Sequence, residues 1–177
     1  RVGTTGATAV RFVFGLPFAA VMLLALWPFM ELPIIGPGTL AFAGLGAAAQ
    51  IAATAFMLLT MRGQSFGVAT ALMKTEPVTL ALIGALVLAE PLGPARMGAI
   101  GVATLGVVLA SGASWSQAGL RPILNGIAAG ALFGISAIGY SGATLEVGDG
   151  NYLFRAALTL SVVTLLQSVA MSVWLRL

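Results

Sequence analysis

Long apolar stretches constrain the fold of this chain more than any other feature. They cover residues 8–29, 39–61, 66–90, 95–114, 122–142 and 152–175. An α-helix rises about 1.5 Å per residue, so roughly 20 apolar residues cross the hydrocarbon core of a bilayer. Lipid cannot satisfy open backbone groups, which makes helices the expected form of every span. The sequence therefore predicts an all-α, polytopic transmembrane helix bundle with six spans in this chain.

The composition supports a membrane location and excludes several kinds of chemistry. Charged residues make up 7% of the 177 residues and hydrophobic residues 59%, whereas soluble domains carry about 25% charge. The net charge of +3 comes from few groups, so it does not indicate nucleic-acid binding. The chain contains neither cysteine nor histidine, which excludes disulfides, thiol chemistry, histidine-bound metals and Ser-His-Asp catalysis. We expect a lipid bilayer as partner, and no metal or cofactor.

A charged cluster lies inside the third apolar stretch, as Lys74-Thr75-Glu76-Pro77. A charge at membrane depth costs at least a few kcal/mol and usually marks a polar pathway. Pro77 cannot donate to the Met73 carbonyl, which predicts a kink and a free acceptor beside the charges. We predict a substrate or ion site at Glu76 and Lys74. Because the chain has no histidine, we expect Glu76 to carry any coupling proton, with Lys74 or an acid at a helix end as the alternative. The alternatives are a tolerated, hydrogen-bonded Glu76 and a Lys74 that extends to the membrane interface.

Uncharged polar residues at membrane depth are further site candidates. Gln50 lies at the middle of the second stretch, and Ser136 and Tyr140 are one helical turn apart in the fifth. Buried polar groups need hydrogen-bond partners, so all three could line a cavity. The alternatives are hydrogen bonds between helices for Gln50 and bonds within their own helix for the hydroxyls. Gln167 is a similar but weaker candidate. Arg11 either extends to the headgroups or meets an anionic substrate or Glu76.

Three glycines recur every four residues in the fifth stretch, at Gly126, Gly130 and Gly134. Small residues at this spacing form one stripe where another helix can approach closely. We therefore predict helix packing along this stripe, with a substrate path as the alternative.

A weak internal repeat relates two parts of the chain. The segment that ends at Arg11 resembles the segment that ends at Arg155, and the two arginines are 144 residues apart. Each arginine follows a glycine at the start of an apolar stretch. Transporters are often built from such repeats, with the substrate site between them.

The stretch Ala71–Ala110 resembles the fourth and fifth helices of an EamA domain, in the drug/metabolite transporter (DMT) superfamily. Pro77, Glu90, Gly98 and Gly106-Val107 fit the family pattern, and Ala89 replaces its usual glycine. Residues 11–14 resemble the start of the family's second helix, and residues 126–136 resemble its first helix.

The resemblance implies ten helices in two inverted five-helix repeats around a central cavity. Residues 1–117 would be the first repeat without its first helix, and residues 118–177 the first two helices of the second repeat. The chain would then be a piece of a longer protein. It also implies a secondary transporter of small metabolites or drugs, working as an exporter by alternating access, in the plasma (bacterial inner) membrane.

Three other functions compete with transport. A channel is possible, but it would usually show rings of like charge or a filter sequence. A lipid-modifying enzyme would need a cluster of histidines or aspartates near an interface, and the sequence has none. A membrane scaffold would leave the cost of burying Lys74 and Glu76 unexplained. We therefore predict a transporter rather than an enzyme. The arginine bias places the chain's first residue in the cytoplasm, whereas the family resemblance places it on the opposite side.

Overall fold

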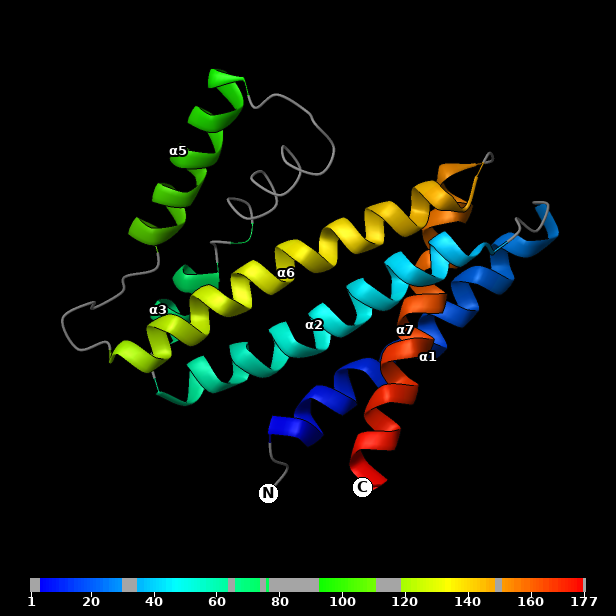
Figure 1. Ribbon diagram of the computed structural model, residues 1–177, viewed down its shortest axis with the longest axis horizontal. Helices are drawn as coiled ribbons and strands as arrows, with labels where there is room; N and C mark the ends of the chain where they lie inside the picture. The colour runs from blue at the N-terminus through cyan, green and yellow to red at the C-terminus, as the bar shows by residue number, and fades with distance from the viewer. Residues whose placement is uncertain are drawn as a thin grey trace. The chain divides into compact units, whose positions relative to one another are not determined.

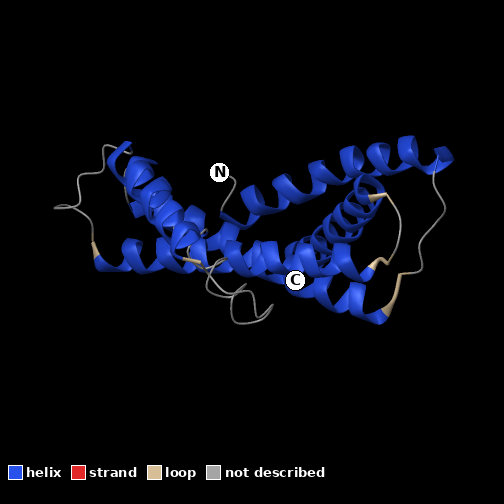
Figure 2. Ribbon diagram, turned by 90° about the horizontal axis from the view of Figure 1, so that it is seen from above, coloured by secondary structure: helices blue, strands red, loops and turns tan. Residues whose placement is uncertain are grey.

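The computed structural model describes residues 4–29, 35–63, 66–73, 76, 93–110, 119–148 and 151–176. Every regular element within these ranges is helical (Figures 1 and 2). The elements are α1 (Thr4–Leu26) with the short 3-10 turn η1 (Trp27–Phe29), α2 (Pro37–Gly63), α3 (Phe66–Met73), α5 (Pro94–Ala110), α6 (Leu120–Glu146) and α7 (Tyr152–Arg176). The predicted all-α class is thus confirmed for the described part of the chain.

Long apolar helices identify the chain as a polytopic integral membrane protein. The segments Thr8–Leu26, Pro37–Arg62, Leu120–Glu146 and Tyr152–Leu175 are each long and apolar enough to cross a bilayer. They confirm four of the predicted spans. Of the other two, the span at 66–90 lies largely outside the described residues, and α5 has a shorter apolar part at Met97–Gly106.

Large apolar side chains point outward along these helices. Phe14 is 68% exposed and Phe18 79% exposed on α1, and Leu165 and Val169 are about half exposed on α7. In water, exposed apolar surface of this extent would be unfavourable. In a bilayer the surrounding solvent is itself apolar, so the outward side chains fit a membrane environment.

Local sequence signals set the boundary between α6 and α7. Gly148 follows the end of α6 with a φ of 85°, and its N–H donates to the Leu145 carbonyl at 3.3 Å. This left-handed glycine is a common helix stop, and α6 reaches Glu146 rather than the predicted residue 142. The Asn151 side chain accepts from the Leu153 N–H at 2.9 Å and so caps the start of α7.

The chain packs as two compact units. The first contains residues 1–51 and 136–177, and the second contains residues 52–135. Helices α2 and α6 contribute residues to both. Each unit draws on both expected repeat regions, 1–117 and 118–177, and the boundary between those regions stays a prediction.

In the first unit, α1 and α7 pack antiparallel, as Figure 1 shows. Ser161 and Ser168 are two turns apart on one face of α7. The Ser161 hydroxyl lies 3.1 Å from the Ala19 carbonyl, and the Ser168 hydroxyl donates to the Phe12 carbonyl at 3.1 Å. Phe12 and Met171 are buried beside them. Small hydroxyl residues hold membrane helices together in this way because they allow close approach.

Also in the first unit, α2 and α6 approach at glycines. A Cβ added at Gly139 would lie 2.7 Å from the Cα of Gly46 and 2.9 Å from the Phe42 carbonyl oxygen. The ring of Phe42 packs over Gly142. The two backbones come this close only because Gly139 and Gly46 have no side chains. Around this contact lies a core of small buried residues, Ala43, Ala47 and Ala143, together with Val163.

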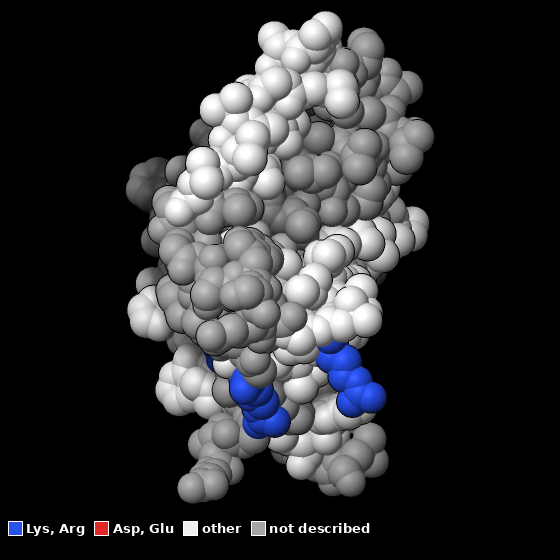
Figure 3. All heavy atoms as spheres, turned by 90° about the vertical axis from the view of Figure 1, so that its left-hand side faces the viewer, with Lys and Arg blue, Asp and Glu red and all other residues white. Residues whose placement is uncertain are grey.

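In the second unit, α3 packs against the first half of α6. A Cβ on Gly126 would lie 2.5 Å from the Cβ of Leu72. Gly130 and Gly134 are also buried, and the packing role of the three-glycine stripe stays a prediction. Arg62 is the basic residue in the last turn of α2. Figure 3 shows basic side chains in the lower part of the face it presents, next to uncharged side chains.

Candidate functional site

A neutral hydrogen-bonded cluster joins three helices of the first unit. The Tyr140 hydroxyl, from α6, donates to the Oε1 atom of Gln50 on α2. It also accepts a hydrogen bond from the Nε2 atom of Gln167 on α7, at 2.9 Å. Gln167 is only 3% exposed. We call these three residues the Tyr140 cluster.

The Tyr140 cluster lies deep in the membrane-spanning part of the molecule. Gln50 stands near the middle of the span Pro37–Arg62, which places it about 20 Å from each end at 1.5 Å per residue. Unpaired polar groups at that depth cost several kcal/mol. Mutual hydrogen bonds remove much of this cost, and they link α2, α6 and α7.

A cavity of about 290 Å³ opens beside the Tyr140 cluster. Its polar lining consists of Arg11, Thr164 and the three cluster residues. Its apolar lining comes from α1 and α7, at Phe12, Gly15, Phe18, Ala19, Met22, Leu160 and Val163. We call it the Arg11 cavity. Its size is at the lower end of the range for small-molecule sites.

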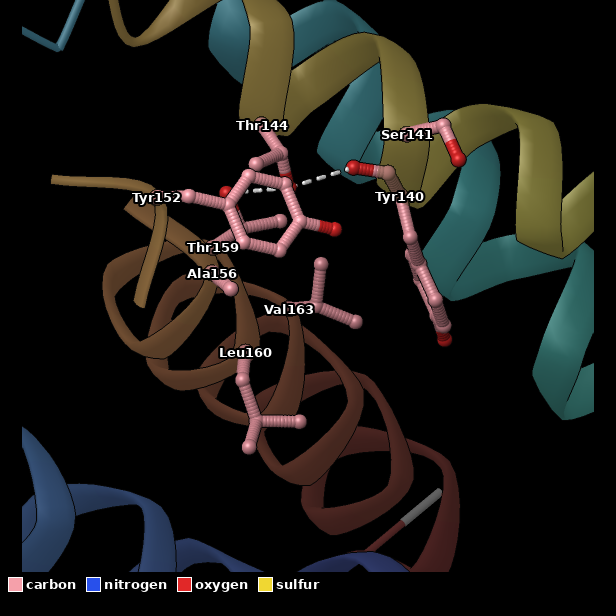
Figure 4. A pocket seen from close by; sticks show the side chains of 8 residues that line it. All are labelled: Tyr140, Ser141, Thr144, Tyr152, Ala156, Thr159, Leu160 and Val163. Atoms are coloured by element: carbon pink, nitrogen blue, oxygen red, sulfur yellow. Dashed lines mark hydrogen bonds between the residues drawn. The ribbon is translucent and has the colours of Figure 1, made fainter. Parts of the chain in front are cut away.

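A second cavity of about 220 Å³ lies near the connection between α6 and α7 (Figure 4). Hydroxyl groups dominate its polar lining. The Thr144 hydroxyl lies 2.8 Å from the Tyr140 carbonyl, to which it donates, and 3.2 Å from the Thr159 hydroxyl. The residues that line only this second cavity are Ser141, Thr144, Tyr152, Ala156 and Thr159. We call it the turn cavity.

The two cavities share one wall, formed by Tyr140, Leu160 and Val163. In Figure 4 the Tyr140 ring extends from α6 with its hydroxyl directed away from Thr144. Along α7 the combined lining runs from Tyr152 to Gln167, which is about 22 Å of helix. A hydrocarbon core is about 30 Å thick. The two cavities thus follow one another in series along this part of α7.

The two arginines of the predicted repeat have different surroundings. Arg155 donates to the Thr144 carbonyl at 2.7 and 3.0 Å and to the Leu145 carbonyl at 3.2 Å. It therefore satisfies backbone acceptors at the carboxyl end of α6, where a cation is also favoured by the helix dipole. Arg11 lines the Arg11 cavity, with its guanidinium carbon 5.7 Å from the centre of the Phe12 ring.

The structure brings together some of the predicted site residues. Gln50 and Tyr140 meet directly. Ser136 is buried where α6 meets α2, and its carbonyl oxygen would lie 3.2 Å from a Cβ on Gly46. Ser136 lines neither cavity. Glu76 is helical and half-buried in the second unit.

Two predicted positions, Lys74 and Pro77, lie outside the described residues. The residue that sequence reasoning ranked too low is Gln167, which completes the Tyr140 cluster. The sequence signal for Gln167 was a side-chain amide deep in an apolar helix, which is the same signal that selected Gln50. Among the residues that the structure describes, no group of three or more acidic, histidine or cysteine side chains is placed to hold a metal ion.

Comparisons with known proteins identify no relative. No protein-family model matches the chain, and neither a curated protein nor a solved structure matches it at a significant level. The geometry of the helices, the Tyr140 cluster and the two cavities is therefore the basis for a functional conclusion.

Proposed function

We propose that this membrane protein is a secondary transporter of small metabolites, related to the EamA transporters that its sequence resembles. The observation that carries the proposal is the pair of cavities in series, separated by Tyr140, Leu160 and Val163. Alternating access requires a closed partition with space on both sides of it. We further propose a plasma (bacterial inner) membrane location and a coupling proton or ion at Glu76.

The partition can open at moderate cost. Tyr140 is held across it by hydrogen bonds with Gln50 and Gln167. Hydrogen bonds between membrane helices contribute roughly 0.6–1.7 kcal/mol each. A substrate that offers its own donors and acceptors can replace these bonds, so that Tyr140 moves and the two cavities join. An ion pair in place of these neutral groups would be too strong for a substrate to replace in this way.

The rival functions predict different access to water. A scaffold requires a helix bundle that is closed to water, and an enzyme requires a site that water reaches from one side of the membrane. A transporter requires one position that water reaches from both membrane faces at different times. This difference can be tested before any substrate is known.

The absence of native cysteine allows the test with single cysteines. Thr164 lines the Arg11 cavity, whereas the next residue, Leu165, is 50% exposed on the outside of α7 and lines neither cavity. Thr164→Cys and its matched control Leu165→Cys would be produced in the full chain. Each would be treated with a membrane-impermeant maleimide in right-side-out and in inverted membrane vesicles. Maleimides react with the thiolate, which forms in water and not in lipid.

We expect Thr164→Cys to react in both kinds of vesicle and Leu165→Cys to react in neither. Reaction of Thr164→Cys from one face only would indicate a one-sided pocket and would reject transport. Failure to react from either face would favour a scaffold, provided that circular dichroism shows a helical chain and that the chain stays in the membrane fraction on alkaline extraction.

A further inference from the structure

We infer that the Arg11 cavity binds a small amphipathic organic monoanion, with its carboxylate toward Arg11 and its apolar part between α1 and α7. This inference rests on the proposed transport function, because it names the class of substrate for the same site. It follows from the charge, the donor geometry and the size of the cavity.

The charge of the cavity lining has one sign. Arg11 is cationic. The other polar residues that line the cavity are neutral, namely Gln50, Tyr140, Thr164 and Gln167. No aspartate or glutamate belongs to the described lining. A carboxylate would be attracted to Arg11 in a site that is largely apolar. An ammonium group would lose its hydration beside a like charge, which disfavours amines and zwitterions.

The donor geometry favours a carboxylate in particular. A guanidinium presents a planar fork of N–H donors that matches the two oxygens of a carboxylate. Arg11 stands only three residues inside the span that begins at Thr8, so its Cα lies about 5 Å along the helix from that end of the span. Its side chain is exposed, and Phe12 packs beside its guanidinium. Arg11 therefore lines the cavity from a position near one end of the span, where its side chain is also exposed.

The size and the apolar wall define the remainder of the ligand. A volume of about 290 Å³ suits a small molecule rather than a lipid with two acyl chains. Phe18 and Met22 supply an apolar surface on α1, and Leu160 and Val163 supply one on α7. A single ring or a short alkyl chain would replace the hydration of this surface.

The test uses protection of Thr164→Cys from the impermeant maleimide. Three probes of nearly equal shape differ in charge: 3-phenylpropanoate, 3-phenylpropanamide and 3-phenylpropylamine. We expect 3-phenylpropanoate to protect the cysteine at a concentration roughly tenfold lower than the amide, which corresponds to one charge-assisted contact of about 1.4 kcal/mol. The amine should give no protection.

A substitution series attributes the preference to Arg11. Arg11→Gln in the Thr164→Cys background should remove the preference for the carboxylate over the amide, and Arg11→Lys should retain part of it. Arg62→Gln is the matched control, because it also removes one positive charge but lies at the end of α2 and lines neither cavity. It should leave the preference unchanged.

Three outcomes would overturn the inference. Equal protection by the carboxylate and the amide would show that charge does not select the ligand. A preference for the carboxylate that persists in Arg11→Gln would show that Arg11 does not bind it. Protection by phosphatidylglycerol alone, in a comparison of vesicles with and without that lipid, would assign the anion to a lipid headgroup. In each case the cysteine can still react from both membrane faces, so the transport proposal would stand.

A second measurement covers the case in which Thr164→Cys does not fold. The unsubstituted chain in detergent should have its melting temperature raised more by 3-phenylpropanoate than by the amide, since a ligand stabilises the state that it binds. Equal or absent shifts at saturating concentrations would also reject the inference.

Discussion

The contact between α2 and α6 gives the sharpest stability prediction. Gly139→Ala places a methyl group against backbone atoms, 2.7 Å from the Gly46 Cα and N and 2.9 Å from the Phe42 carbonyl oxygen. Backbone atoms cannot rotate away as a flexible side chain can. The helices must therefore separate at this point.

The distance by which α2 and α6 must separate determines how much Gly139→Ala destabilises the protein. Ordinary carbon contacts begin near 3.4 Å, so the backbones must part by about 0.7 Å, and overpacking of this kind costs about 1–3 kcal/mol. Alanine also favours the helix over glycine by up to about 1 kcal/mol. Gly44→Ala on α2 provides the matched control, because a Cβ there meets no atom within 4 Å.

The two variants share the same chemical change, so the helix-propensity gain cancels in their difference. We expect Gly44→Ala to be neutral or slightly stabilising, and Gly139→Ala to be less stable than Gly44→Ala by about 1–3 kcal/mol. The measurement is unfolding in mixed detergent micelles, followed by circular dichroism. Equal stability of the two variants would show that Gly139 does not lie against α2 and would refute the packing argument.

Three further predictions concern other parts of the chain. Gly126→Leu should lower the yield and the thermal stability in detergent, because its Cβ would overlap Leu72; an unchanged melting curve would contradict this contact. Arg155→Gln should destabilise the fold by about 1–2 kcal/mol, because the Thr144 carbonyl loses a charged donor, with Arg155→Lys intermediate in the same unfolding assay. Glu76→Gln should leave the protein inserted but reduce vesicle flux or its dependence on pH; wild-type flux at every pH would reject a role for this carboxylate.

Much of the local structure is predictable from the sequence because lipid restricts the backbone so strongly. Four apolar stretches became spans close to their predicted limits, since only helices satisfy backbone groups without water. The turn between α6 and α7 follows from Gly148 and Asn151. The depth of Gln50 and Tyr140 was also enough to select them as polar candidates, and they do meet.

Which residues meet across helices was decided by tertiary structure. Gln50 and Tyr140 are 90 residues apart in sequence, and Gln167 lies a further 27 residues on. Likewise, the backbones of α2 and α6 come into contact at Gly46 and Gly139, outside the glycine stripe that the sequence emphasised. Arg11 and Arg155 look equivalent in sequence, yet one lines a cavity and the other caps α6.

The physical reason is the solvent. A soluble helix shows its buried face by an apolar stripe, whereas a helix in lipid is apolar on every side and loses that signal. Its partners are chosen by close fit and by a few hydrogen bonds, which depend on the positions of all the helices together. The sequence by itself therefore determined that this chain forms membrane-spanning helices and where several of them end. Only the packed structure determined which faces meet, and with them the Tyr140 cluster and the two cavities that share Tyr140, Leu160 and Val163.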